Sequence, residues 1–481
     1  MGKEGKPYGG FGRRRLVYPR LIEARNYGSQ LTLFINEEIT LSLGPADIFP
    51  ETFLLQYDEG ASRVIHNMNG TELNKMVYHD TDQRAAVSVE RDKGLRVHGI
   101  IRDSLRIRPV IIVERSSAGH IAHEIFSVDE HFSNTRDDYL EVPPLQPAQL
   151  IKERSITVPS TVRPEIMMLV DTTRNKNLKR PIKVALYAGV LMASVNIRYS
   201  SMTDPKLKTR LCFVKILSKK LTRDLYKYVT YQGTEYLDAS ATLDSLKQEV
   251  RKTSYEKYDA VLLLTKFGVP VPRPHGRSWT SMSSGIAYLA GVCLEGKVAL
   301  LEDDGLSHSG VYTAAHELGH LLGCPHDGGQ APPSLPNSPG AASCSDSDGF
   351  LMTSAITDTS NKNIYQLSSC SKEQIRYVAE HDDYECLRKR TLRSDLSTDR
   401  LPGSVTTPNE TCEMNLRAFN RSGGYHEDKD GMLERCVLYC TTSPDQDGRF
   451  SLLNVTAPDG TRCSDSKPPK LCIAEECVDW I

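Results

Sequence analysis

The chain has 481 residues, of which 39% are hydrophobic and 25% are charged. Its 59 basic and 61 acidic side chains nearly cancel, which argues against a nucleic-acid-binding protein, since such proteins normally carry a clustered basic excess. The same balance argues against a long acidic or basic tail. A chain of this length is expected to form two or three domains, each able to bury a core.

The 12 cysteines are unevenly distributed, because none occurs before Cys212. Their even number, with half of them up to Cys386 and half beyond it, indicates disulfides formed in an oxidising compartment. We expect the first group to crosslink a central domain and the second group to crosslink a C-terminal one. The two groups are Cys212, Cys293, Cys324, Cys344, Cys370 and Cys386, then Cys412, Cys436, Cys440, Cys463, Cys472 and Cys477.

Glycosylation sequons at Asn69, Asn409, Asn420 and Asn454 agree with an extracellular location. Residues 1–30 contain no apolar core of a signal peptide. We therefore expect a secreted protein whose signal sequence is not visible in this sequence. The best apolar run ends at Val195 and is shorter than the roughly 18 residues that a membrane span needs.

Residues 31–126 predict a β-rich N-terminal region built from short strands separated by turns. The strands are expected at 31–35, 53–57, 85–89 and 95–101, the last entered through a hairpin turn at 92–94. A proline-containing stretch at residues 141–147 ends this region and is interpreted as a linker.

The next region alternates strands with helices, which predicts an α/β layer with a mostly parallel sheet. Strands are expected at 166–170, 211–217, 260–265 and 298–301, and helices at 182–197, 243–255 and 311–322. Ser371 and Gln374 form a capping-box pattern for a late helix that runs to about residue 382. Beyond residue 390 regular periodicity fades while cysteines remain dense, so disulfides rather than a large apolar core are expected to stabilise the tail.

The sequence His-Glu-Leu-Gly-His-Leu-Leu-Gly-Cys-Pro-His-Asp at residues 316–327 carries the chemistry. On a helix, His316 and His320 project from one face, one turn apart, and both can reach a single Zn²⁺ at about 2.0–2.1 Å. Glu317 is rotated by about 100° and stands beside the metal, where a general base is needed. A turn at Gly323 would return His326 as the third ligand. Three protein ligands leave one position open, as in catalytic zinc sites.

Residues 316–327 followed by a methionine resemble the metzincin pattern, and Asp327 after the third histidine resembles the adamalysin/reprolysin branch. The resemblance identifies Met352 as the methionine of the turn, which packs beneath the ligands without binding metal. It also implies that Cys293 pairs with Cys386. The remaining histidines, among them His120, His123, His275 and His308, have no ligand spacing and are interpreted as surface or core residues.

The run from residue 302 to 328, together with the cysteine-rich tail, resembles the secreted reprolysin-like metalloproteases of tick saliva. That resemblance implies a zymogen with three parts. A β-rich propeptide would occupy residues 1–155, and a metzincin-type catalytic domain of mostly parallel sheet plus helices would occupy residues 156–390. A small disulfide-rich domain would follow at residues 391–481.

One departure from the family concerns latency. Many related propeptides hold a cysteine whose thiolate caps the zinc, whereas residues 1–211 contain no cysteine. A thiol switch within the propeptide is therefore excluded, and latency must use another side chain or steric cover. Lys152-Glu153-Arg154 offers a basic cleavage point, with solvated surface as the alternative interpretation.

The sequence thus predicts a secreted zinc metalloendopeptidase in which Glu317 takes a proton from water and delivers it to the leaving amine. By resemblance, its substrates would be host fibrinogen, fibronectin or other matrix proteins. The strand at 298–301 is expected to border the cleft, where an extended substrate could add as a further strand.

Two other functional classes stay open. The first is an adhesion or matrix-binding protein that acts through residues 391–481, although the chain contains no Arg-Gly-Asp sequence. The second is a catalytically silent scaffold, although such proteins typically lose a ligand or the base, and this chain keeps all of them. Expected partners are protein and peptide substrates, with no nucleic acid and no membrane span. A structural Ca²⁺ and the oligomeric state are left open.

Overall fold

The computed structural model describes most of the chain, and its described residues form two compact units. Unit 1 comprises Met1–Phe53, Asn69–Glu249 and Tyr258–Thr391, and unit 2 comprises Leu54–Met68, Val250–Lys257 and Leu392–Ile481. Described residues are 14–22, 31–59, 62–92, 94–110, 119–128, 138–142, 158–171, 180–231, 234–252, 255–266, 269–270, 282–356, 361–389, 402–418, 421–426, 431–444, 448–473 and 476–480.

A fully antiparallel sheet forms the N-terminal part of unit 1, which confirms the expected β-rich region. Its strand order is β1-β11-β10-β9-β8-β7-β4-β3-β2. One face is apolar at alternate positions, and side chains such as Leu33, Leu41 and Val97 are fully buried there. The strands are β1 (Arg15–Val17), β2 (Arg20–Ile22), β3 (Leu31–Asn36), β4 (Ile39–Pro45), β7 (Val77–Asp80), β8 (Ala85–Glu90), β9 (Arg96–Arg102), β10 (Leu105–Pro109) and β11 (His123–Ser127).

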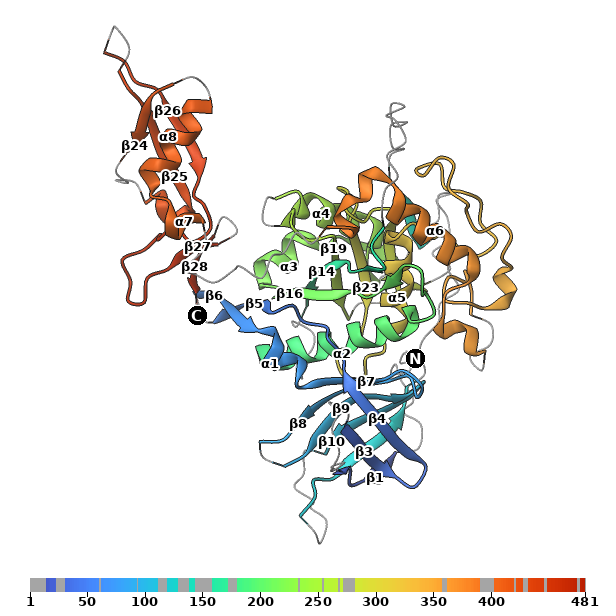
Figure 1. Cartoon of the computed structure of the whole chain (residues 1–481). Coiled ribbons are helices and arrows are strands. Elements are labelled where there is room, and N and C mark those ends of the chain that lie inside the picture. Colours follow the sequence, from blue (N-terminus) through green and yellow to red (C-terminus); the bar gives the residue numbers. More distant parts are fainter. Residues whose placement is uncertain are drawn as a thin grey trace. The chain divides into compact units, whose positions relative to one another are not determined.

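A long helix, α2 (Pro181–Tyr199), lies between this sheet and the second sheet of unit 1 (Figure 1). It packs on strands β7, β8 and β9 and also on α5 and β16. Burial from both sides explains why its residues are apolar almost all round. No helix in the described part of the chain, α2 included, is long and apolar enough to cross a bilayer.

The second sheet of unit 1 is mostly parallel, as the alternation of strands and helices predicts. Its order is β12-β22-β23-β19-β14-β16, and only the β22–β23 pair is antiparallel. The inner strands β14 and β19 are apolar except at Glu165 and Thr265, and they are buried along their whole length because both faces of the sheet are covered. The bounds are β12 (Tyr139–Glu141), β14 (Glu165–Val170), β16 (Arg210–Ile216), β19 (Ala260–Thr265), β22 (Gly285–Leu289) and β23 (Val298–Glu302).

Further helices and short strand pairs surround these sheets. The helix predicted at 243–255 begins and ends earlier, as α4. The helices are α1 (Gly70–Asn74), α3 (Lys219–Leu225), α4 (Ala239–Val250), α5 (Val311–Leu321) and α6 (Ser369–Glu380), with 3-10 turns η2 (Asp346–Asp348), η3 (Lys362–Tyr365) and η4 (Asp382–Leu387). The pairs are β13 (Thr161–Val162) with β15 (Lys206–Leu207), β17 (Tyr228–Tyr231) with β18 (Thr234–Leu237), and β20 (Val269–Pro270) with β21 (Met282–Ser283).

Unit 2 combines the cysteine-rich tail with a β-hairpin from early in the chain. Strand β28 pairs in parallel with β6 and antiparallel with β27. Its core is largely disulfide sulfur packed with a few apolar side chains, as expected for so small a unit. The elements are most of β5 (Thr52–Glu59), β6 (Ser62–Asn69), α7 (Pro402–Val405), α8 (Pro408–Ala418), β24 (Gly423–Tyr425), η6 (Leu433–Arg435), β25 (Val437–Thr442), β26 (Leu452–Thr456), β27 (Leu471–Ile473) and β28 (Glu476–Trp480).

The disulfides match the expectation in the tail but only partly in the central region. All tail cysteines pair, as Cys412–Cys440, Cys436–Cys472 and Cys463–Cys477. In the central region, the pair Cys293–Cys386 is confirmed and Cys344 pairs with Cys370. Cys212 and Cys324 are instead free and buried, so the expectation that the whole first group forms crosslinks was wrong. An even number of cysteines determines neither which of them pair nor whether all of them form disulfides.

Candidate active site

Helix α5 carries the first part of the histidine motif and lies deep in unit 1. It packs against strands β22 and β23 and against α2. Tyr199 of α2 donates its hydroxyl to the carbonyl oxygen of Ala315 at 2.6 Å. Each residue of α5 except Tyr312 is buried, so the helix is held firmly while one face stays polar. His316 and His320 project from that face, one turn apart, as their spacing predicts.

The three motif histidines converge through their Nε2 atoms. Nε2 of His316 lies 3.0 Å from that of His320 and 3.2 Å from that of His326. Nδ1 of His316 lies 2.7 Å from the Leu351 carbonyl oxygen, and Nδ1 of His320 lies 2.8 Å from that of Cys324. Because a carbonyl oxygen only accepts, each Nδ1 must carry the proton and donate. This leaves both Nε2 lone pairs directed at one point, as in metal-ligating histidines.

His326 joins this group because the chain turns sharply after the helix. Gly323 has φ of +94°, and a Cβ atom there would lie 2.6 Å from Cγ2 of Val378. Both facts require glycine at this position, as the motif predicts. The turn is closed by a hydrogen bond from the Cys324 amide to the Gly319 carbonyl oxygen at 3.0 Å.

Met352 lies directly beneath the helix, which confirms its expected packing role. A Cβ atom on Gly319 would lie 2.5 Å from the Met352 sulfur, so the methionine fills the space that the missing side chain leaves. The side chain of Met352 is fully buried. Its carbonyl oxygen accepts a hydrogen bond from the Asp327 amide at 2.9 Å, which links the methionine turn to the end of the motif.

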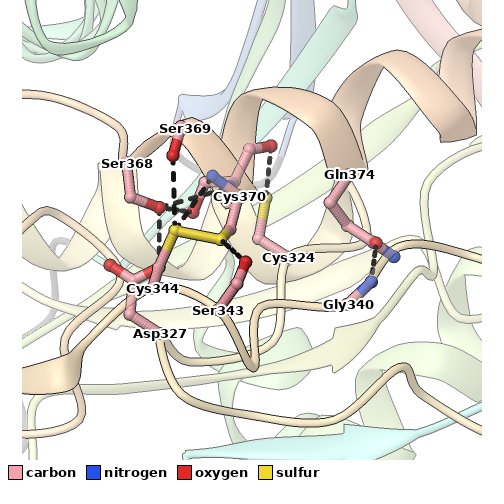
Figure 2. The surroundings of a disulfide bond; sticks show 10 residues. Cys324, Asp327, Gly340, Ser343, Cys344, Ser368, Ser369, Cys370 and Gln374 are labelled. Atoms are coloured by element: carbon pink, nitrogen blue, oxygen red, sulfur yellow. Dashed lines mark hydrogen bonds between the residues drawn. A yellow bond between two sulfur atoms is a disulfide. The ribbon is translucent and has the colours of Figure 1, made fainter.

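Asp327 is anchored by the start of helix α6, as Figure 2 shows. The Ser368 hydroxyl donates to Oδ1 of Asp327 at 2.6 Å and accepts from the Ser371 amide at 3.1 Å. Ser368 is therefore the N-cap of α6, and the expected cap at Ser371 was wrong. The Gln374 carbonyl oxygen Oε1, which a capping box would send back to the helix start, accepts from the Gly340 amide at 2.9 Å instead.

Glu317 lies beside the histidines and is only 2% exposed. Its Oε1 atom lies where a side chain on Gly285 would be, 2.6 Å from the position of a Cβ atom there. Its Oε2 atom has no hydrogen-bond partner among the described residues. Burial, and then the neighbouring charge of Asp138, raise the pKa of Glu317 well above its usual range. An oriented, buried carboxylate with one vacant acceptor suits a group that exchanges a proton with water.

The histidine group fits a single zinc ion. Ligands at about 2.0–2.1 Å around a tetrahedral ion are separated by about 3.3–3.4 Å, close to the Nε2 separations of 3.0 and 3.2 Å in the structure. All of these side chains are at least nine-tenths buried, and the Nδ1 atoms of His316 and His320 are held by backbone oxygens. Zinc is the ion for which such imidazole sets are typical.

Sequence reasoning missed one carboxylate at this site. Asp138, just before β12, places its oxygens 3.0 to 3.2 Å from the Nε2 atoms of all three motif histidines. It is only 5% exposed. The surrounding sequence Arg-Asp-Asp-Tyr has no spacing that marks a ligand, and its distance along the chain from the motif hides the contact. The one signal in the sequence was the lack of a cysteine in residues 1–211, which indicated that another side chain would have to cover the zinc site.

The expected position of the strand at 298–301 was wrong, whereas the interpretation of His308 is confirmed. Strand β23 does not border the cleft, because it lies between β22 and β19. The strand next to the site is β22. The prediction failed because a sequence does not reveal the order of strands in a sheet. His308 lies outside the histidine group and stacks on Tyr187, with ring centroids 3.9 Å apart, which confirms its interpretation as a core residue. Lys152-Glu153-Arg154 lies outside the described residues.

Comparisons with known proteins agree with this geometry. Residues 190–366, which include the whole histidine motif and Met352, match the model of metallo-peptidase family M12 of the reprolysin type. The venom metalloproteinase BumaMPs1 of Olivierus martensii is 26% identical over 376 residues, covering 76% of this chain and 89% of that protein. The venom metalloproteinase antarease TserMP_A of Tityus serrulatus is 26% identical over 391 residues, covering 78% and 93%.

A third relative has a different overall length. "A disintegrin and metalloproteinase with thrombospondin motifs like" of Bombyx mori is 26% identical over 329 residues, which cover 66% of this chain and 45% of that protein. Residues 190–366 are therefore a metallopeptidase domain of family M12, of the reprolysin type, and the chain is a metalloendopeptidase.

Proposed function

We propose that the chain is a secreted zinc metalloendopeptidase in which His316, His320 and His326 hold the ion and Glu317 is the catalytic base. The observation that carries this proposal is the convergence of the histidine Nε2 atoms, 3.0 and 3.2 Å apart, while the Nδ1 atoms of His316 and His320 donate to backbone oxygens. Such an arrangement supports a preformed metal site. Metallopeptidases of family M12, which residues 190–366 match, are zinc-dependent, and this supports zinc as the ion.

Bound zinc would act as a Lewis acid, polarising the scissile carbonyl and lowering the pKa of the attacking water. Glu317 accepts the proton of that water and passes it to the leaving amine. Its burial against Gly285 keeps the carboxylate oriented, and burial strengthens its basicity relative to an exposed glutamate. Met352 and the backbone oxygens of Leu351 and Cys324 hold the ligands in place.

We further propose that the protein acts outside the cell as a zymogen, with a propeptide at residues 1–155 and a catalytic domain at 156–390. A cysteine-rich domain would follow at 391–481. The five disulfides support an oxidising compartment. Asn69, Asn409 and Asn454 are exposed, which suits glycosylation. Extracellular proteins such as fibrinogen and fibronectin are the proposed substrates.

A structural calcium ion is not part of this proposal. Among the described residues, two groups of side chains offer three or more ligand atoms close together. One is the histidine group with Asp138. The other consists of Cys436, Cys463 and Cys472, which are all in disulfides and therefore cannot act as thiolate ligands.

Metal removal tests the proposed function. The protein, freed of its N-terminal region by limited proteolysis, is treated with a zinc chelator and then supplied with one equivalent of zinc. We expect cleavage of a proteome-derived peptide library, and of fibrinogen and fibronectin, to stop and then return. A His320→Ala variant should not regain activity, whereas His426→Ala, at an exposed histidine of unit 2, should behave like wild type. Cleavage that resists the chelator would refute the proposal.

A further inference from the structure

A short strand from the N-terminal region lies in the active site. Strand β12 pairs in parallel with β22, with Tyr139, Leu140 and Glu141 opposite Ala287, Tyr288 and Leu289. The Ala287 amide donates to the Asp138 carbonyl oxygen at 3.1 Å. β22 is otherwise the edge strand of the catalytic sheet. β12 therefore uses the backbone groups that an extended peptide substrate would need.

Side chains on both sides of β12 seal this position. The ring of Tyr139 packs against those of His320 and His326, with centroids 4.7 and 5.4 Å apart. Val142 is buried, and its Cγ1 atom fills the space beside Gly296. The segment is thus an ordered part of the site rather than a loop that passes over it.

Asp138 stands at the position where a fourth metal ligand is required. Oδ2 lies 3.2 Å from Nε2 of His316, while Oδ1 lies 3.2 Å from that of His320 and 3.0 Å from that of His326. These lengths match the edges of a tetrahedron whose corners are three nitrogens and one carboxylate group, since Zn–O and Zn–N bonds are both about 2.0–2.2 Å. The carboxylate closes the only corner that the histidines leave open.

The polarity of the contact also favours a shared cation. His316 and His320 donate through Nδ1, so their Nε2 atoms face the carboxylate with lone pairs. Carboxylate oxygens offer lone pairs as well. Nitrogens and oxygens that face one another in this way at 3.0–3.2 Å need an electrophile between them, and a single divalent ion satisfies all four side chains.

We propose that Asp138 is the fourth zinc ligand in the uncleaved chain and that β12 occupies the substrate cleft, so that the N-terminal region keeps the enzyme latent. This inference rests on the proposed function. It replaces the missing propeptide cysteine with a carboxylate that coordinates the ion and excludes the attacking water. Removal of the segment opens both the fourth coordination position and the edge of β22.

The first test measures zinc retention in the uncleaved chain, in a Glu317→Gln background that prevents self-cleavage. Zinc transfer to a chromogenic chelator is compared for three proteins in this background: the parent that keeps Asp138, the Asp138→Asn variant and the Asp138→Ala variant. Asn keeps the shape of the side chain, so it separates ligation from packing. We expect both variants to release zinc at least about 10-fold faster and the visible spectrum of the cobalt-substituted protein to change. Glu141→Gln, at an exposed carboxylate of the same strand, is the matched control.

The second test measures latency without the Glu317 substitution. The uncleaved Asp138→Asn and Asp138→Ala chains should hydrolyse peptides at least about 10-fold faster than uncleaved wild type, while Glu141→Gln stays latent. Zinc release, cobalt spectrum and latency that match wild type in both variants would overturn the inference. If instead the proposed function is wrong, the zinc-loaded chain would cleave no peptide even after its N-terminal region is removed. The zinc-release measurement would still decide whether Asp138 is a ligand.

Discussion

The Nδ1 atom of His316 donates a hydrogen bond to the carbonyl oxygen of Leu351 at 2.7 Å, and Leu351 directly precedes Met352. One turn of the chain therefore orients the first histidine and also fills the space under Gly319. The tyrosine hydroxyl of Tyr312 donates to the same carbonyl oxygen at 3.0 Å. The methionine turn thus acts on the site through packing and through its backbone.

This relationship predicts that Met352→Ala destabilises the protein and loosens the metal site. Because Met352 is fully buried, the cavity should cost about 2–5 kcal/mol in the free energy of unfolding. Zinc affinity should fall as well, since the Leu351 carbonyl is no longer held. Urea denaturation and chelator competition measure the two effects. Met414→Ala, at a methionine that is 54% exposed, is the control, and equal losses in both variants would contradict the account.

A second prediction concerns the support of Asp327. Ser368→Ala removes the N-cap of α6 and the hydrogen bond to Oδ1 of Asp327 together. Loss of a cap and of a buried hydrogen bond to a carboxylate should cost about 1–3 kcal/mol. Ser369→Ala changes an exposed neighbour and should cost less than about 0.5 kcal/mol. Thermal denaturation of both variants makes the comparison, and a smaller loss for Ser368→Ala would count against this role.

A third prediction follows from the free cysteines. Cys212 and Cys324 are fully enclosed, and burial raises the pKa of each thiol, which suppresses the reactive thiolate. The native protein should therefore resist alkylation by iodoacetamide. After denaturation without reductant, peptide mass spectrometry should find the label at these two residues and at no disulfide cysteine. Labelling of the native protein at Cys324 would show that the site is more open than described.

A fourth prediction concerns acid stability. His123 accepts the Val97 amide through Nε2 and donates through Nδ1 to the Ile121 carbonyl oxygen, and burial lowers its pKa to about 4. Between pH 6.5 and pH 4 the unfolded chain, with a histidine pKa near 6.5, binds a proton at His123 that the folded chain does not bind. Stability from this residue is thus complete above pH 6.5 and is lost as pH falls toward 4, by up to about 3 kcal/mol.

His308 adds to this loss, because burial, and then the charges of His98 and Arg106, hold its pKa well below the usual value. The melting temperature followed from pH 7 to pH 4 measures the effect. The decline should be shallower in His123→Gln, while His120→Gln, at a partly exposed histidine, keeps the wild-type slope. Parallel curves for wild type and His123→Gln would disprove the assignment.

Much of the fold and the site could be predicted from local sequence. Strand and helix periodicity located β19 and α5 within a residue or so, because buried apolar runs and an amphipathic helix leave strong local patterns. The spacing of His316, Glu317 and His320 and the glycine at 323 describe a helix face and a turn, which depend only on neighbouring residues.

What escaped prediction depends on contacts between distant segments. Ser368, not Ser371, caps α6, and Gln374 accepts the Gly340 amide of a separate loop instead of closing a capping box. The place of β22 beside the site follows from strand order, which no single strand encodes. Asp138 reaches the histidines only because β12 joins that same edge.

The central claim, that Glu317 supplies the base while the histidines hold zinc, is tested most directly by Glu317→Gln, measured after proteolytic removal of the N-terminal region. We predict that the variant keeps one zinc per chain while turnover of a peptide substrate falls by about 10²–10⁴-fold, and that Glu373→Gln, at an exposed glutamate of α6, matches wild type in both measurements. Wild-type turnover in Glu317→Gln, or loss of its zinc, would contradict the account.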